Sequence, residues 1–106
     1  MIRFMRLLIF FDLPVKTKTD RKTATNFRKF LIKDGFYMVQ YSVYCRICNG
    51  HDSVVNHEKI VSANLPKSGS VRTLIVTENQ YENMRLLVGK EKPNDRKFVE
   101  GQLSLF

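Results

Sequence analysis

Residues 3–12 carry the clearest pattern of hydrophobic and polar positions in the chain. Leu7, Ile9 and Phe11 would lie on one face of an extended backbone, and Phe4, Leu8 and Phe10 on the other. A strand that is apolar on both faces is typical of one that is covered on both. Pro14 ends the pattern, and residues 16–19 are polar. The sequence therefore predicts a central strand followed by a polar loop.

Helical spacing follows over residues 20–34. Thr19 or Asp20 suits the N-cap of this helix, and Gly35 suits its C-terminal end. The apolar face would consist of Ala24, Phe27, Phe30 and Leu31. Lys22, Lys29 and Lys33 face the opposite way, with Arg21 and Arg28 on the flank. Such a helix packs on a sheet and presents positive charge outward.

The remaining elements are shorter. Residues 36–40 and 42–46 predict two adjoining strands joined by a bulge or a short turn. The pattern then predicts a helix over 51–65, a strand over 71–77, a short helix over 78–88 that Thr77 caps, a loop over 89–95 and a last strand over 98–106.

This order of elements predicts an α+β fold. Strand, helix, strand, strand, helix and strand give the ferredoxin-like split β-α-β arrangement, followed by a tail strand. We expect residues 1–88 to form this domain and residues 89–106 to form a polar loop and the tail. Both long helices would cover one face of the sheet and leave the other face bare. An exposed apolar face predicts a homodimer through the open side of the sheet.

The charge of the chain says more about its function than its overall composition does. The chain has 106 residues, 43% hydrophobic and 26% charged, which is typical of a single globular domain. Its net charge is +8, and the excess is uneven: residues 1–48 carry ten basic and three acidic side chains, whereas residues 49–106 carry eight and seven. This asymmetry favours a polyanionic partner, with nucleic acid first. A solubilising surface is the alternative.

The sequence also bears on location. The apolar run from Leu7 to Phe11 is too short to cross a bilayer, and no small-residue cleavage site follows it. We therefore expect a cytoplasmic bacterial protein with no signal peptide and no membrane partner. Cys45 and Cys48 are expected to be free thiols in a reducing compartment.

Asp12 is the leading candidate for chemistry. It ends the apolar strand, on the pleat face of Leu8 and Phe10, where a carboxylate must be solvated, hydrogen-bonded or bound to a cation. If a dimer axis passes nearby, two Asp12 side chains would share a proton or a Mg²⁺ ion. Such an ion would polarise a phosphodiester and activate water. The alternative is that Asp12 only caps the turn after the strand.

Four candidate zinc ligands lie close together in the sequence. Cys45, Cys48, His51 and His57 form the spacing C-x₂-C-x₂-H-x₅-H. Structural zinc sites pair two separated ligand couples, whereas this group runs from a strand directly into a helix. No zinc site is therefore expected.

Residues 35–39 invite comparison with the RNA-recognition motif. That signature needs a basic residue before the glycine and aromatic residues repeated on the exposed face. Here Asp34 precedes Gly35, and Met38 and Gln40 occupy the face that Phe36 uses. A small RNA-binding module is therefore only an alternative.

Several segments together resemble a known family. These segments are Arg6-Leu7-Leu8-Ile9-Phe10-Phe11-Asp12-Leu13-Pro14, the helix segment Asn26-Phe27-Arg28-Lys29-Phe30-Leu31, the pair Gly35-Phe36 with Gln40-Tyr41-Ser42-Val43-Tyr44, and residues 71–81. Their sequences and their order along the chain resemble those of the small CRISPR-associated spacer-acquisition proteins. This "Cas-two" family is matched over about residues 1–85, most closely in the version found beside type II systems.

The resemblance implies a function. Family members are ferredoxin-like homodimers that sit between two integrase dimers in a heterohexameric complex and hold the middle of a double-stranded prespacer DNA during spacer integration. The family is also described as Mg²⁺-dependent nucleases, which implies that Asp12 is the catalytic residue and metal ligand, with the ion shared by two protomers. The scaffold role is favoured, with weak endonuclease activity beside it. A nuclease acting on RNA or DNA as its main role is the alternative.

The chemistry around Asp12 indicates where DNA would bind. We expect phosphate contacts from the polar loop and the first helix, by Lys16, Lys18, Arg21, Lys22 and Arg28. Lys29 and Lys33 are expected to matter less.

The last five residues resemble a second kind of motif. Their sequence is similar to the short peptide by which bacterial DNA-processing proteins bind the replication sliding clamp, and the residues that would make the contact are Gln102, Leu103, Leu105 and Phe106. Leu105 and Phe106 would enter an apolar pocket, with Gln102 as the polar anchor. The alternative is a final strand that pairs with the partner's sheet edge.

Overall fold

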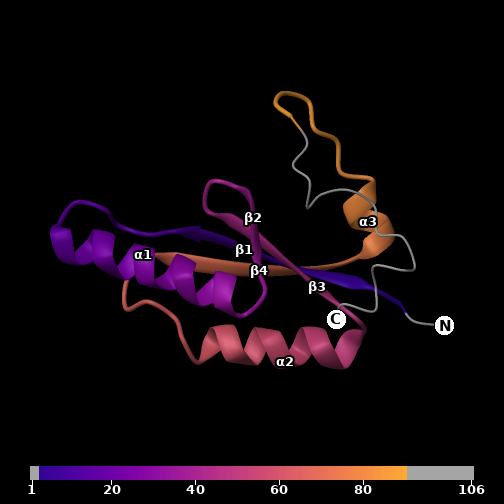
Figure 1. Cartoon of the computed structure of the whole chain (residues 1–106), viewed down its shortest axis with the longest axis horizontal. Helices are drawn as coiled ribbons and strands as arrows, with labels where there is room; N and C mark the ends of the chain where they lie inside the picture. The colour runs from indigo at the N-terminus through magenta and orange to yellow at the C-terminus, as the bar shows by residue number, and fades with distance from the viewer. Residues whose placement is uncertain (1–2, 91–106) are drawn as a thin grey trace.

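A computed structural model of the chain describes residues 3–90. Its elements are β1 (Met5–Asp12), α1 (Lys18–Lys33), β2 (Tyr37–Gln40), β3 (Val43–Cys48), α2 (His51–Ser62), β4 (Ser70–Thr77) and α3 (Glu78–Glu82). The four strands form one sheet in the order β2-β3-β1-β4, and all neighbours are antiparallel. This order confirms the α+β, ferredoxin-like fold (Figure 1). The predicted strand over 98–106 lies outside the described residues.

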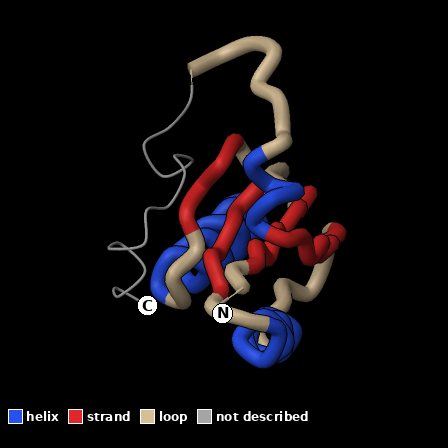
Figure 2. Tube along the Cα trace, turned by 90° about the vertical axis from the view of Figure 1, so that its right-hand side faces the viewer, coloured by secondary structure: helices blue, strands red, loops and turns tan. Residues whose placement is uncertain are grey.

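The main core lies between the sheet and the two long helices. Leu7, Ile9 and Phe11 of β1 point into it, as their alternation predicted, and pack with Phe27 and Leu31 of α1 and with Val54 and Val61 of α2. Complete burial of such side chains contributes roughly 1.5–3 kcal/mol each. Both helices are seen nearly end-on in Figure 2, so their axes run alongside each other. The predicted apolar face of α1 is confirmed, with Phe30 at its margin.

The N-cap of α1 differs from the prediction. The cap is Thr17, and neither Thr19 nor Asp20 fills this role. The Thr17 hydroxyl accepts a hydrogen bond from the Asp20 amide at 3.0 Å, and Asp20 Oδ2 accepts one from the Thr17 amide at 3.3 Å. Asp20 is thus the third residue of a capping box, which satisfies two backbone N–H groups at the helix start.

Two helices end earlier than predicted. Helix α2 stops at Ser62 and α3 stops at Glu82, whereas the patterns predicted 65 and 88. Beyond these ends, Leu65 is half exposed and Val88 is almost fully exposed. A short helix without a surface to bury its apolar face gains too little to extend. Thr77 caps α3 as predicted, through a capping box with Gln80.

The second face of the sheet is only partly bare, which corrects the expectation of an uncovered face. Helix α3 lies against it, and Tyr81 is buried beside Leu8 and Cys45. Beside α3 remains an open hollow of about 310 Å³. Its walls include apolar side chains of β1, β2, β3 and the segment after α3: Leu8, Phe10, Val39, Val43, Met84 and Leu86.

The predicted junction of β2 and β3 is confirmed as irregular. The register shifts between Met38 and Gln40, and Ser42 has a positive φ of 63°. Among residues 3–90, no helix is long and apolar enough to cross a membrane.

Candidate functional site

Asp12 is the last residue of β1 and is exposed to solvent. Its partner in the sheet register is Ser70, the first residue of β4. Gly69, with φ +88°, lies so close that a Cβ atom there would be 2.5 Å from the Asp12 carbonyl oxygen. Only glycine tolerates both this backbone conformation and this approach. The turn before β4 is therefore built to bring the start of that strand against Asp12.

A hollow of about 280 Å³ adjoins the Asp12 side chain. The end of β1, the turn between β2 and β3, and the start of β4 form its walls: Phe10, Phe11, Asp12, Tyr41, Ser42, Val43, Ser70 and Arg72. Arg72 pairs with Phe10 and so lies diagonally across from Asp12 on the same face of the sheet. The hollow thus offers one carboxylate and one guanidinium within a partly apolar surface.

The turn at residues 41–42 is tied to β1 next to Asp12. The Phe11 amide donates a hydrogen bond to the Ser42 carbonyl oxygen at 3.1 Å. Tyr41 remains 73% exposed. Arg28 Nη2 donates to the Tyr41 hydroxyl at 3.1 Å, and the Arg28 guanidinium lies 5.0 Å from the Tyr41 ring centroid. The Tyr41 ring is therefore exposed to solvent while Arg28 fixes its position.

The five basic residues predicted to bind phosphate fall into two groups. Lys16, Lys18, Arg21 and Lys22 are exposed in the loop after β1 and in the first turns of α1. Arg21 also donates to the carbonyl oxygens of Val15 and Lys16, at 3.1 and 3.2 Å, and so fixes the shape of the loop. Arg28 differs, because it is half-buried and lies over the Phe11 ring as well as that of Tyr41.

The four candidate zinc ligands do not converge. Both cysteines are free and buried. Cys45 packs with Leu8 on the α3 side of the sheet, whereas Cys48 belongs to the core under α1 and α2. His57 Nδ1 lies 2.8 Å from the Asp34 carboxylate. Within residues 3–90, no three His, Cys, Asp or Glu side chains are grouped to hold a metal.

The Phe36 ring is not available to stack on an RNA base. It is only 3% exposed and belongs to the core between the sheet and the long helices. An RNA-recognition surface needs its aromatic rings on the open face. The structure therefore does not support the comparison of residues 35–39 with that motif.

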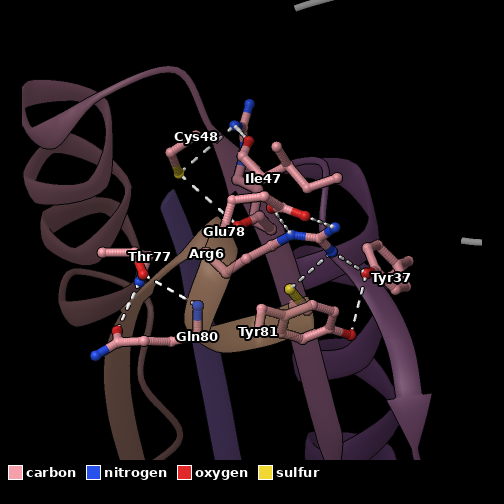
Figure 3. Close-up of polar contacts among 10 residues, drawn as sticks. Arg6, Tyr37, Ile47, Cys48, Thr77, Glu78, Gln80 and Tyr81 are labelled. Atoms are coloured by element: carbon pink, nitrogen blue, oxygen red, sulfur yellow. Dashed lines mark hydrogen bonds and ion pairs between the residues drawn. The ribbon is translucent and has the colours of Figure 1, made fainter. Parts of the chain in front are cut away.

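A buried ionic cluster lies under α3, and no pattern in the sequence predicted it. Arg6 of β1 is fully buried and makes two hydrogen bonds to the Glu78 carboxylate, of 2.6 and 3.0 Å (Figure 3). It also donates to the Tyr37 hydroxyl, and its guanidinium lies 4.1 Å from the Tyr81 ring centroid. Burial would lower the pKa of Arg6, but the hydrogen bond to Glu78 and the nearby Cys45 and Tyr37 together outweigh this effect, so the pKa is raised. This cluster fixes α3 on the sheet.

Cys45 completes the cluster, with its Sγ 3.7 Å from Arg6 Nη1. Burial raises the pKa of this thiol, and the nearby Arg6 opposes the effect only in part. Burial, followed by the proximity of Cys45, also raises the pKa of Tyr37. A protonated, buried thiol is a poor nucleophile and metal ligand. Cys45 is therefore a packing residue at neutral pH.

Sequence reasoning missed Tyr41 and Arg72 as members of the Asp12 hollow. Arg72 is placed there by the register of β4 against β1, which the pattern of a single strand does not reveal. The position of Tyr41 offered a signal, because an aromatic residue in the turn between two strands is expected to be exposed and so available to a ligand.

The fold and this hollow define a class: a small ferredoxin-like protein with a carboxylate at the end of its first strand and a basic loop and helix beside it. The family described as CRISPR associated protein Cas2 matches residues 5–84. A protein of Acidovorax ebreus named "CRISPR-associated endoribonuclease Cas2" is 51% identical over 102 residues, which cover 96% of this chain and 100% of that one.

Two further relatives carry the same name. The Campylobacter jejuni protein is 45% identical, over 98% of this chain and 73% of its own length. The Ligilactobacillus salivarius protein is 46% identical, over 95% of this chain and 100% of its own length. The chain belongs to the Cas2 family of CRISPR-associated proteins.

Proposed function

We propose that the protein is a homodimer that holds double-stranded prespacer DNA and bridges two integrase dimers during spacer integration. The observation that carries this proposal is the exposed basic group formed by Lys16, Lys18, Arg21 and Lys22, at the end of the sheet where Asp12 lies. Arginine and lysine in this setting neutralise phosphates without reading sequence. Such contacts suit a protein that must accept DNA of any sequence.

The open side of the sheet supports the dimer. Leu74 is 49% exposed there, next to Leu8 in the register, and the apolar hollow beside α3 adjoins it. An exposed apolar surface of this kind marks an interaction site in a small domain. A second copy packed on this face would bury it and bring the two β1 strands together.

Metal-dependent cleavage at Asp12 is the second part of the proposal, and the endoribonuclease names of the relatives favour it. Mg²⁺ takes one or two carboxylates and completes its coordination with water and phosphate oxygens. A single exposed Asp12 per protomer therefore fits an ion shared across the dimer axis. When bound, Mg²⁺ would polarise the phosphodiester. Asp12 would hold the ion, and Arg72 would orient the phosphate. A nuclease acting on RNA or DNA as the main role is the alternative.

Reconstituted spacer integration with the cognate integrase separates these roles. Reactions contain wild-type protein, Asp12→Ala, or no added protein. If wild type stimulates integration and Asp12→Ala matches it, the protein is a scaffold and the carboxylate serves cleavage alone. If Asp12→Ala forms an intact dimer and is inactive, Asp12 belongs to the integration mechanism. Equal integration with and without the protein would overturn the proposed function.

A further inference from the structure

We infer that Tyr41 is a stacking platform for one unpaired nucleobase at the Asp12 hollow, that Arg28 positions its ring, and that Arg72 contacts the adjoining phosphate. The inference rests on nucleic acid being the ligand, as proposed above. It deepens that proposal by naming the side chain that would bind one unpaired nucleotide, and it assigns Arg28 a different role from the other four basic residues.

The exposure of Tyr41 is the first observation. Its side chain is 73% exposed, although Phe11 and Tyr44 nearby are buried. Arg28 covers one side of the ring at 5.0 Å and binds the hydroxyl at 3.1 Å. An aromatic ring held in this way loses little conformational freedom when a ligand stacks on it. Bases stack on such rings in single-stranded nucleic acid sites.

The backbone at Ser42 is the second observation. Its φ of 63° is uncommon for a residue with a side chain. The conformation is maintained by a hydrogen bond to the Ser42 carbonyl oxygen from the amide of Phe11, the residue that precedes Asp12. Strained backbone of this kind persists where the surrounding structure fixes it, and it is enriched at functional sites. Here it sets the position of Tyr41 relative to Asp12.

The combination of groups in the hollow is the third observation. It places an aromatic ring, the Asp12 carboxylate and the Arg72 guanidinium around about 280 Å³ of space. These groups match the parts of a nucleotide: a ring for the base, a guanidinium for the phosphate and a carboxylate beside the bond to be cleaved. A base inside a duplex has both faces covered by its neighbours, so only an unpaired or extruded base can use Tyr41.

Arg28 follows from the same geometry as a positioning residue. Its guanidinium lies over the rings of Tyr41 and Phe11, at 5.0 and 5.7 Å. Lysine would keep the charge but lose the planar group that covers these rings. Arg28→Lys is therefore expected to disturb Tyr41 more than it disturbs the electrostatic attraction of DNA.

Fluorescence of 2-aminopurine tests the inference directly. The probes are oligothymidine and oligouridine strands with one central 2-aminopurine, whose emission is quenched by stacking, and a duplex of the same length. Binding is measured in EDTA so that no cleavage occurs. Tyr41→Ser is compared with Tyr41→Phe and with Ile32→Ser, which removes another exposed apolar side chain, 59% exposed, from the far end of α1.

The expected result is specific to the single strand. Tyr41→Ser should bind it roughly 5- to 100-fold more weakly and lose the quenching, because base stacking is lost. Tyr41→Phe and Ile32→Ser should keep the quenching, and all three should bind the duplex like wild type. Arg28→Lys should reduce the quenching with little change in the salt dependence of duplex binding. Quenching with either the deoxy or the ribo strand supports the inference.

The opposite results are equally clear. If Tyr41→Ser retains its fold by circular dichroism, and its quenching and affinity equal those of wild type, the inference is overturned while duplex binding still stands. If wild type quenches the single strand but does not bind the duplex, the prespacer-holding function fails and the inference survives.

Discussion

The Arg6 guanidinium and the Glu78 carboxylate form a two-point ion pair between residues 72 positions apart in the sequence. Arg6 is fully buried in β1, and the Glu78 side chain is 19% exposed at the start of α3. Tyr37 and Tyr81 complete the shell around the guanidinium (Figure 3). This pair joins α3 to the sheet and so decides which part of the open face remains available to a partner.

Removing one member of this pair is expected to destabilise the protein strongly. Glu78→Ala leaves the buried Arg6 charge without its partner, which should lower the free energy of unfolding by about 3 kcal/mol. Urea denaturation checks this value, with Asn79→Ala, an exposed position on the same helix, as the control. The double substitution Arg6→Met and Glu78→Met should regain most of the loss. A loss below about 1 kcal/mol for Glu78→Ala would contradict the pairing.

Stability should fall at alkaline pH because of Cys45. Burial raises the pKa of this thiol above its ordinary value of about 8.5. Above that pH the unfolded chain loses the thiol proton while the folded chain keeps it, so the unfolded state binds fewer protons and unfolding becomes easier. The slope contributed by this group is at most about 1.4 kcal/mol per pH unit.

The measurement is the free energy of unfolding between pH 7 and pH 10, for wild type and for Cys45→Ala. Wild type should lose stability progressively above about pH 8.5, whereas Cys45→Ala should lose less over the same interval. Parallel curves for the two proteins would show that the Cys45 thiol does not hold its proton on folding.

The fold was predictable from local patterns, whereas the site depended on contacts between distant segments. Alternation along β1 placed Leu7, Ile9 and Phe11 on the core face without reference to any other element. The burial of Arg6 was not predictable, because an arginine in a strand is normally exposed and its partner lies in another element. Similarly, Arg72 joins Asp12 only through the β1–β4 register, and the position of Tyr41 depends on the φ of Ser42.

The open sheet face gives a prediction about assembly. Leu74→Asp would place a charge in the proposed interface and should convert the dimer to a monomer, because an unpaired buried charge is costly. Leu65→Asp is a matched control, since Leu65 is 50% exposed after α2 and Leu74 is 49% exposed on β4. Sedimentation equilibrium measures the mass of each. A Leu74→Asp protein that remains dimeric would place the interface elsewhere.

Residues 102–106 give a prediction about a second partner. If Gln102, Leu103, Leu105 and Phe106 bind the sliding clamp, a chain ending at Gly101 should lose measurable affinity for purified clamp. The mass of the truncated protein must equal that of a dimer for the comparison to count. Equal binding by full-length and truncated protein would rule out residues 102–106 as a clamp-binding peptide.

The basic loop and helix give a prediction about DNA. Reversing the charge of Lys16 and Arg21 to Glu should weaken duplex binding and make the slope of log K against log salt shallower by about 2, because each phosphate contact contributes roughly 0.9. Lys59→Glu with Lys67→Glu changes the net charge equally at exposed positions in and after α2, and should leave the slope nearly unchanged. If both pairs flatten the slope alike, DNA responds to the overall charge of the protein. A change confined to the first pair places phosphates beside the start of α1, within reach of Asp12.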